Sequence, residues 1–236
     1  MNMKAVITGS TKGIGLAIVR ALLKEGWDVA VTSRNENDLN KLKEEANASW
    51  PERQILIHRV DFSKKEETIN YGKTIIHEWN EIDMLINNVG IFFPGAVHKE
   101  DDGALEKMIA TNLYSAYHLT RELIPGMMDR KKGAVINMCS IASFMAYPNG
   151  GSYTISKFAM YGFSKVLREE MKPYGIKVTS LLLGSTWTDS WAGTNFPDSR
   201  LMKPEDVAEA VIAITKMSDA SVVEDIIIRP QLGDLP

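Results

Sequence analysis

The strongest constraint in this sequence is a regular alternation, from one end to the other, between short β-rich runs and longer runs with helical periodicity. Most of the β-rich runs are nearly continuous apolar stretches, which is typical of parallel strands buried on both faces. This alternation predicts a parallel sheet covered by helices on both sides, with right-handed crossovers. The expected strands are Lys4–Ile7, Val29–Thr32, Ile55–Val60, Met84–Asn87, Ala134–Met138, Lys177–Leu182 and Val222–Ile228. Residues 1–236 are therefore expected to form one doubly wound α/β domain with a seven-stranded parallel sheet.

The runs between the strands carry helix-start signals and apolar stripes. Ser63 followed by Glu66 predicts a capping box that opens the third helix, whose buried face is expected to include Ile76. A long fourth helix is expected from Leu105 to Met127, and a fifth from Tyr153 to Met171. The one long irregular stretch, residues 184–202, is expected to be a mobile binding loop or lid, because loops of this length are uncommon in compact domains.

Composition and charge exclude several classes of protein. Hydrophobic residues make up 44% of the 236 residues and charged residues 24%, close to the averages for soluble globular proteins. A formal net charge of −3 gives no basic excess for the nucleic-acid backbone, so no nucleic-acid partner is expected. No apolar run approaches the roughly 18 residues that a membrane span needs, so no membrane partner is expected.

The single cysteine, Cys139, favours a reducing, cytoplasmic location, because it cannot form an intrachain disulfide. The apolar stretch at the N-terminus is too short for a signal peptide. The 4 histidines and Cys139 show no metal-ligand spacing, so no metal site is expected.

A glycine-rich turn over residues 8–15 joins the first expected strand to the first expected helix. Its spacing, Gly9-x-x-x-Gly13-x-Gly15, allows a tight turn and a close approach of the backbone to a pyrophosphate. The N-terminus of the helix that follows would present free N–H groups and a positive dipole end to that anion. The turn therefore predicts a dinucleotide site at the carboxyl end of the first strand.

This turn is one of five motifs that together resemble the short-chain dehydrogenase/reductase family. The motifs are Thr8-Gly9-x-x-x-Gly13-Ile14-Gly15, Asn87-Asn88-Val89-Gly90, Asn112, Ser140 and Tyr153-Thr154-Ile155-Ser156-Lys157. The resemblance covers essentially the whole chain and implies a Rossmann-type fold and an NADP-dependent oxidoreductase that acts on a small-molecule carbonyl or alcohol. The C-terminal residues resemble those of bacterial sepiapterin-reductase-like members.

The catalytic candidates form a chemically consistent group. Tyr153 and Lys157 are spaced to share one helical face, and a nearby ammonium is expected to lower the tyrosine pKa from about 10. Tyr153 would then act as the general acid for a carbonyl oxygen that receives a hydride. Ser140, after the fifth strand, can donate a hydrogen bond to the same oxygen. The resemblance adds that Lys157 holds the nicotinamide ribose and that Asn112 anchors a water in a proton relay to Lys157.

The second expected strand ends without the carboxylate that would bind the ribose 2′-hydroxyl of NAD. Arg34 stands beside that position and Lys12 lies in the glycine turn, a pattern that suits the 2′-phosphate of NADP(H). The cofactor-binding residues that the resemblance implies are Gly9, Ser10, Thr11, Lys12, Gly13, Ile14, Gly15, Ser33, Arg34, Asn35, Asp61, Phe62, Asn88, Val89, Gly90, Tyr153, Lys157, Gly184, Thr186 and Thr188.

The substrate is expected to be an uncharged, bulky carbonyl compound. Residues 184–202 carry the aromatic residues Trp187, Trp191 and Phe196, with Gly184 and Gly193 as hinges, and this lid contains no lysine or arginine between Gly184 and Asp198. Facing the lid, the expected substrate wall comprises Phe144, Met145, Tyr147 and Phe93. Aromatic side chains would exclude water from the carbonyl.

Three substrate classes stay open at this point: 3-oxoacyl thioesters, pteridine side-chain ketones, and general hydrophobic ketones or alcohols. A catalytically silent NADP-binding regulator is the alternative of another class.

The long fourth helix is apolar around much of its circumference, at Leu113, Tyr114, Ala116, Tyr117 and Leu119. Such a helix must be covered on two sides, so a homotetramer or a homodimer is expected.

Overall fold

The computed structural model describes residues 2–188, 191 and 196–235, and within them the seven expected strands form one sheet. The strand order is β3-β2-β1-β4-β5-β6-β7, and every pairing is parallel. The strands are β1 (Lys4–Ile7), β2 (Asp28–Ser33), β3 (Ile55–Arg59), β4 (Met84–Asn87), β5 (Gly133–Ser140), β6 (Ile176–Leu183) and β7 (Asp225–Ile228). The expected doubly wound α/β fold is therefore confirmed.

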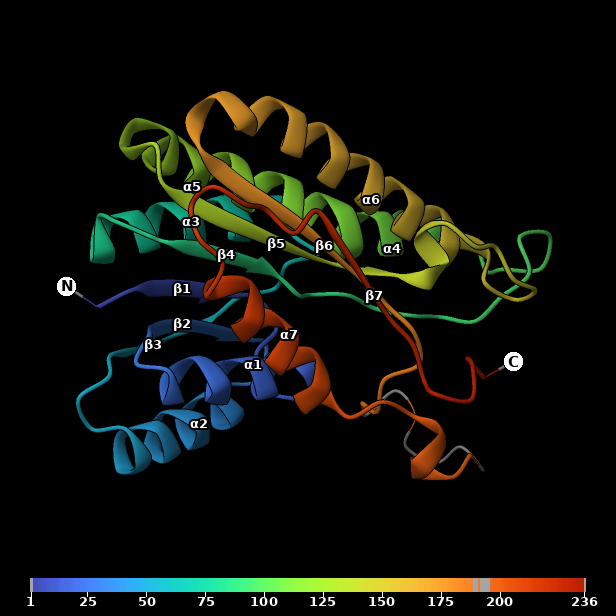
Figure 1. The fold of residues 1–236 in the computed structure, drawn as a ribbon. Coiled ribbons are helices and arrows are strands. Elements are labelled where there is room, and N and C mark those ends of the chain that lie inside the picture. Colours follow the sequence, from blue (N-terminus) through green and yellow to red (C-terminus); the bar gives the residue numbers. More distant parts are fainter. Residues whose placement is uncertain (1, 189–190, 192–195, 236) are drawn as a thin grey trace.

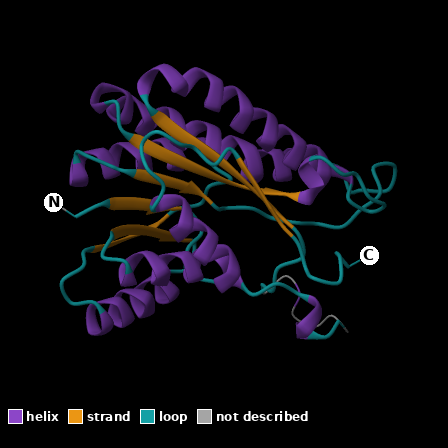
Figure 2. Ribbon diagram, in the orientation of Figure 1, coloured by secondary structure: helices purple, strands orange, loops and turns teal. Residues whose placement is uncertain are grey.

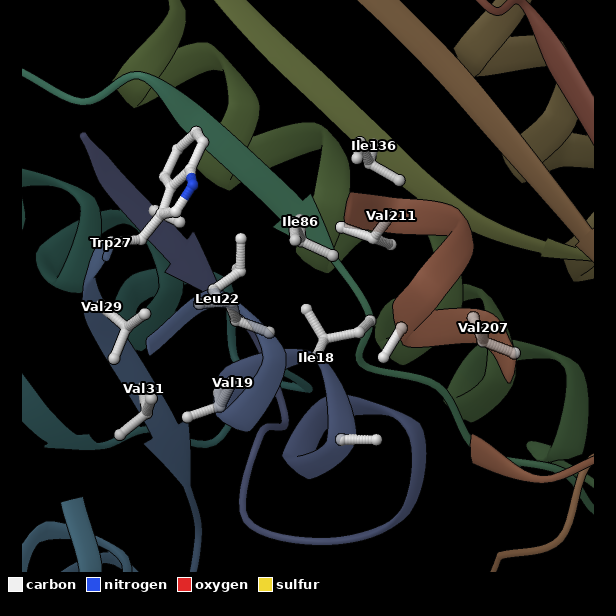
Figure 3. Packing of buried hydrophobic residues seen from close by; sticks show 14 of the residues in the cluster. Ile18, Val19, Leu22, Trp27, Val29, Val31, Ile86, Ile136, Val207 and Val211 are labelled. Atoms are coloured by element: carbon white, nitrogen blue, oxygen red, sulfur yellow. The ribbon is translucent and has the colours of Figure 1, made fainter. Parts of the chain in front are cut away.

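Helices cover both faces of the sheet (Figures 1 and 2). One face carries α1 (Gly13–Lys24), α2 (Glu36–Ser49) and α7 (Pro204–Thr215). The other face carries α3 (Lys65–Trp79), α4 (Ala104–Ile109), α5 (Ser115–Arg130) and α6 (Gly151–Met171). Both layers bury continuous apolar clusters against the sheet. Figure 3 shows one of them, in which Ile18 and Leu22 of α1 and Val211 of α7 pack on Ile86 and Ile136 of the central strands.

The chain reverses direction across the sheet between β1 and β4. It runs outward from β1 to β3 and then returns to place β4 against the free side of β1, with Ile7 opposite Ile86. In open α/β sheets ligands bind in the crevice outside the carboxyl ends of the strands at such a reversal. Those ends point to the right in Figure 1, where the loops after β4 and β5 also project.

The third helix differs from the expectation at its start and on its face. It begins at Lys65 with Lys64 as N-cap residue, so the predicted capping box is wrong. Ser63 instead bonds the Asp61 carboxylate through both its backbone N–H and its hydroxyl group, in a turn that ends before the helix begins. Ile76 is 40% exposed, because the buried stripe runs one position earlier through Tyr71, Ile75 and Trp79.

The long fourth helix is regular at both ends and carries a π-helical turn, η1 (Ala110–Tyr114), between α4 and α5. Such turns insert an extra residue into the helix and are frequent at functional sites. Asn112 lies inside this turn and is buried. The last strand, β7, begins at Asp225 rather than at the predicted Val222.

Among the residues described, no helix has the length and the apolar character that crossing a bilayer requires. Nor does this part of the chain contain a group of three or more His, Cys, Asp or Glu side chains that could hold a metal ion.

Candidate active site

The glycine turn after β1 adopts the backbone that its sequence predicts. Gly9 and Gly13 have positive φ angles of 62° and 51°, which glycine adopts without strain. A Cβ atom on Gly15 would lie 2.4 Å from the carbonyl oxygen of Gly9 and 2.7 Å from the side-chain nitrogen of Asn88. The turn can therefore close only with glycine at this position.

The first turn of α1 receives no capping bond from the side chain of its own N-cap residue. That residue, Lys12, is extended, and none of the first-turn residues is acidic. By contrast, the N-terminus of α2 is capped by Asn35, whose side chain accepts from the N–H groups of Asn37 and Asp38. The open N–H groups and the helix dipole make the start of α1 suited to a phosphate group. This cradle fits the pyrophosphate of a dinucleotide.

Asn88 and Thr8 fix the turn against the end of β4. The Asn88 side-chain amide donates to the carbonyl oxygens of Thr8 at 2.9 Å and of Gly9 at 2.8 Å. In return, the Thr8 hydroxyl accepts from the N–H groups of Asn88 and Val89. A Cβ on Gly9 would lie 2.8 Å from Cγ2 of Val89, so this valine packs directly under the turn. Gly90 follows, on the path from the turn to Asn112 and Lys157.

The end of β2 gathers the residues expected to select the cofactor. Ser33 accepts from the Thr11 hydroxyl at 3.0 Å, and the Lys12 ammonium lies 3.8 Å from the Asp38 carboxylate. Arg34 is exposed at this edge. Arg59, which sequence reasoning missed, pairs with Ser33 across β2 and β3 and donates from Nε to the carbonyl oxygen of Arg34 at 3.2 Å. The sequence could have indicated Arg59, because it is a basic residue at the end of β3, the strand adjacent to β2.

Several expected cofactor contacts have side chains committed to the fold. The Ser10 hydroxyl donates to the carbonyl of Ile7 and accepts from the N–H of Thr32, and Ser10 is fully buried. Phe62 is buried edge-on against Tyr71. Ile14 is partly buried against the core between the sheet and α1. These residues can therefore reach a ligand chiefly through their backbone atoms.

The structure brings Ser140, Tyr153 and Lys157 together at the carboxyl end of β5. Tyr153 and Lys157 lie on the first turns of α6, and the Lys157 ammonium is 5.8 Å from the centre of the Tyr153 ring. Ser140 ends β5, and its hydroxyl donates to the Leu183 carbonyl oxygen at 3.3 Å and accepts from the Ala142 N–H at 3.1 Å. The Ser140 hydroxyl also acts to lower the pKa of Tyr153. The Lys157 ammonium donates to the carbonyl oxygen of Met138 at 2.8 Å. The expected hydrogen-bond donor Ser140, the acid Tyr153 and the cation Lys157 therefore lie close together.

The pKa of Tyr153 shifts in the direction opposite to the expectation. Burial raises this pKa above its ordinary value, and the hydrogen bond with Ser140 lowers it only in part. Burial also lowers the pKa of the Lys157 ammonium. The expected lowering of the tyrosine pKa is wrong for this arrangement, because Lys157 is bonded to the Met138 carbonyl oxygen and desolvation disfavours both charged forms. Tyr153 is consequently held as the neutral acid at neutral pH.

Asn112 reaches the same region from the π-helical turn, with its side chain fully engaged. Its Oδ1 accepts from the Ile91 N–H at 2.7 Å, and its Nδ2 donates to the Ile91 carbonyl at 3.0 Å and to Ser156 Oγ at 2.9 Å. A Cβ on Gly90 would lie 3.5 Å from Asn112 Oδ1 and 3.6 Å from Lys157 Nζ. Gly90 therefore leaves a narrow space that both residues face.

Exposed apolar side chains lie on the loops that follow the strands next to the catalytic group. The set comprises Phe92, Phe93, Phe144, Met145, Tyr147 and Trp187, from three loops that follow β4, β5 and β6. Phe92, which sequence reasoning missed, packs edge-on against Tyr153 with ring centres 4.9 Å apart. Its signal was an aromatic pair one residue after the Asn87–Gly90 motif. Exposed apolar side chains on loops at this edge of the sheet, one of them in contact with Tyr153, suit a binding surface for an apolar molecule.

The expected lid, residues 184–202, is fixed at its base. The backbone N–H of Trp187 donates to the Met202 carbonyl oxygen at 2.9 Å, and the Thr186 hydroxyl donates to the Gly184 carbonyl oxygen. A Cβ on Gly13 would lie 3.0 Å from Thr188 Cγ2, so this segment passes directly over the glycine turn. The rings of Trp191 and Phe196 lie 6.0 Å apart. Residues 189–190 and 192–195, which include the hinge expected at Gly193, lie outside the described residues.

Comparisons with known proteins agree with this geometry. The sequence model described as short chain dehydrogenase matches residues 3–197. An uncharacterized oxidoreductase of Staphylococcus saprophyticus is 28% identical over 96% of each chain. The NADP-dependent 3-hydroxy acid dehydrogenase YdfG of Salmonella typhi is 29% identical over 89% of this chain and 87% of that protein. The crystal structure of a metagenomic short-chain oxidoreductase in complex with NADP is similar with a TM-score of 0.84 and 27% identity over 97% of each chain.

Proposed function

The chain belongs to the short-chain dehydrogenase/reductase family, and on this premise we propose that it reduces an uncharged, bulky ketone or aldehyde to an alcohol with NADPH. The observation that carries the proposal is the meeting of Ser140, Tyr153 and Lys157 beside the open N-terminus of α1. An anion cradle and a proton donor at one edge of the sheet suit a dinucleotide-dependent reduction.

The residues present fit NADP(H). The open first turn of α1, over Gly13, Ile14 and Gly15, would hold the pyrophosphate, and Arg34 and Lys12 would hold the 2′-phosphate. The similar oxidoreductase solved with NADP and the NADP-dependent relative YdfG support this choice of cofactor. When bound, NADPH supplies the hydride that adds to the carbonyl carbon.

The chain's own residues handle the carbonyl oxygen and its proton. Tyr153, which is protonated at neutral pH as an unshifted phenol would be, donates its hydroxyl proton to the oxygen as negative charge develops there. Ser140 donates a second hydrogen bond to the same atom. Lys157 returns a proton toward Tyr153 and orients the ribose. Both protons of Asn112 Nδ2 are engaged by Ile91 and Ser156, so Asn112 would hold the relay water through an oxygen, either the second lone pair of Oδ1 or the main-chain carbonyl.

The substrate wall supports an apolar carbonyl compound. Phe92, Phe144, Met145 and Trp187 are each 39–43% exposed, and such side chains gain by covering an apolar substrate. Thr188 lies beside Gly13 of the glycine turn, and we propose that Gly184, Thr186 and Thr188 contact the nicotinamide end of the cofactor. Small carboxylate substrates would find no basic residue between Gly184 and Asp198.

A substrate panel tests the proposal. NADPH oxidation is followed with acetoacetyl thioesters, diketones, quinones and sepiapterin. Reduction of NADP⁺ is followed with 3-hydroxy acids, because YdfG is named for them. We expect the highest kcat/KM with a bulky uncharged ketone. A clear preference for 3-hydroxy acids would refute the substrate class, and tight NADPH binding without turnover on any compound would favour the silent regulator.

A further inference from the structure

The N-terminus of the catalytic helix α6 is capped by a side chain from a distant loop. Its own N-cap residue, Gly150, has no side chain to do this. Instead, the Glu100 carboxylate accepts from the Ser152 N–H at 2.8 Å with one oxygen and from the Ser152 hydroxyl with the other. Glu100 belongs to the β4–α4 loop (residues 88–103) and lies opposite the residue that precedes Tyr153. The cap therefore acts one residue away from the proposed general acid.

Two glycines make the space for this carboxylate. A Cβ on Gly151 would lie 2.3 Å from Glu100 Oε1, and a Cβ on Gly95 would lie 2.5 Å from Glu100 Cγ. Gly95 also forms a parallel bridge with Gly150 and donates its N–H to the Asn149 carbonyl at 2.9 Å. The β4–α4 loop is thus fastened along the start of α6 by backbone bonds and by Glu100 together.

The same loop carries the ring that packs on Tyr153. Phe92 contacts Tyr153 edge-on at 4.9 Å between ring centres. We propose that Glu100 is a positioning residue, which seats the start of α6 and the β4–α4 loop against each other and keeps the Tyr153 hydroxyl both placed and protonated. The part of this inference that concerns turnover rests on the proposed function, but the placement and protonation of Tyr153 do not.

The direction in which the Glu100 charge changes the pKa of Tyr153 follows from the helix dipole. The positive end of α6 favours the charged tyrosinate, and a carboxylate bound to that end offsets the effect. The other ionisable groups that face Tyr153 are Lys157 on α6, Cys139 on β5 and Tyr147 on the β5–α6 loop. None of these three changes when Glu100 is replaced by glutamine. Loss of the Glu100 charge alone should therefore lower the pKa of Tyr153.

The test is a spectroscopic titration that needs no substrate. Tyrosinate absorbance is measured against pH for the full-length chain and for Tyr153→Phe, and the difference isolates Tyr153. The same pair is measured in the Glu100→Gln background, which keeps the shape of the side chain. We expect the Tyr153 midpoint to fall by about half a pH unit, from the usual size of charge effects at helix ends. An unchanged midpoint would overturn the proposal.

Two further variants separate charge from packing. Asp101→Asn removes the neighbouring exposed carboxylate of the same loop and should leave the midpoint in place. Ser152→Ala removes one hydrogen bond but keeps the Glu100 charge, so it should also leave the midpoint in place while kcat for ketone reduction falls a few fold. A shift in either variant equal to that of Glu100→Gln would refute the role of the Glu100 charge. Absence of turnover in the unaltered chain would instead refute the proposed function and leave the titration readable.

Discussion

At this site some residues use their side-chain atoms to hold the fold, which leaves only their other atoms for the chemistry. Asn88 and Asn112 stand where the motifs place them, yet their side chains are used to tie the β1 turn and the Ile91 backbone. Buried polar groups are costly when unpaired, so side chains next to a ligand crevice are often engaged by the backbone that shapes it. The motifs could predict these positions from the sequence. Which atoms remain for a ligand depends on long-range contacts, such as the one from Asn112 to Ile91, that no local pattern encodes.

Replacing Tyr153 with phenylalanine should abolish reduction and spare cofactor binding. The hydroxyl transfers its proton only in the transition state, so kcat should fall by about 10²–10⁴-fold while the Kd for NADPH stays within about twofold. Steady-state kinetics and a fluorescence titration with NADPH measure the two quantities. Tyr174→Phe, which removes an exposed phenol beyond the far end of α6, is the matched control. Retention of more than a few per cent of the activity in Tyr153→Phe would refute the acid assignment.

The preference for NADPH over NADH should depend on the arginines at the ends of β2 and β3. A charge-assisted contact to a phosphate contributes about 1.5–3 kcal/mol, so Arg34→Ala should weaken NADPH binding about tenfold or more. The Kd for NADH should change little, because that cofactor has no 2′-phosphate. Arg59→Ala should give a smaller loss through its bond to the Arg34 carbonyl. Arg121→Ala, on the outer side of α5, is the control, and equal Kd values for both cofactors in the unaltered chain would contradict the assignment.

The thiol of Cys139 should be inert in the folded protein. Burial raises its pKa to about 11, and only 4% of the residue is exposed. At pH 8 the reactive thiolate is therefore scarce, and reagents cannot reach it. Alkylation by iodoacetamide should be slow at pH 8 and fast after unfolding in guanidinium chloride, as followed by mass spectrometry. Rapid stoichiometric labelling of the native chain would contradict this expectation.

At the scale of elements, regular features could be predicted and irregular ones could not. The parallel strands are buried on both faces, so they appear as apolar runs. All seven predicted ranges overlap the observed strands, and six of them agree to within two residues at each end. The face of α3 was misjudged at Ile76, because that residue lies one position off the Tyr71–Ile75–Trp79 stripe. The π-helical turn η1 left no local signal, and its Asn112 side chain bonds the backbone of the loop after β4, which is distant in sequence.

The π-helical turn should depend on the Asn112 side chain. Asn112→Ala removes three hydrogen bonds and leaves the buried Ile91 backbone and Ser156 hydroxyl without these partners. The free energy of unfolding should fall by about 3 kcal/mol, as expected when buried polar groups lose their partners. Urea denaturation measures this loss, with Asn40→Ala on the exposed side of α2 as control. A change below about 0.5 kcal/mol would show that η1 forms independently of this side chain.

At the scale of the whole molecule, the sheet topology brings segments that are far apart in the sequence together at one site. The crevice at the β1/β4 reversal receives the glycine turn after β1, the Asn88–Gly90 segment after β4, Ser140 at the end of β5 and the start of α6. Each of these follows a strand at the same edge of the sheet, so parallel pairing alone brings them together. This is why five short motifs in the right order could predict the site, whereas the contact of Glu100 with Ser152 could not be read from their spacing.

The outer face of α6 should form the interface between two copies of the chain. Ile155, Phe158 and Val166 are 44%, 46% and 58% exposed along one stripe of this helix, which lies on the outside of its layer (Figure 1). Gly162 interrupts the stripe, and a Cβ built on it finds no atom within 4 Å, so a second helix could approach closely there. Beside it, Tyr114 and Tyr117 are 52% and 38% exposed, whereas Ala116 and Leu119 of the same long helix are buried within the chain.

A self-complementary apolar stripe of this kind suits a two-fold axis, at which each copy covers the same face of the other. We therefore expect a homodimer through α6, or a homotetramer built from such dimers, when the mass is measured by light scattering at micromolar concentration. Val166→Glu places a charge in the stripe and should shift the mass toward the monomer. Ile76→Glu adds the same charge to a comparably exposed position on α3 and should leave the mass unchanged. A monomeric mass for the unaltered chain, or an unaltered mass for Val166→Glu, would refute this interface. In either case the apolar stripe would remain in contact with water and would not be buried by a second copy.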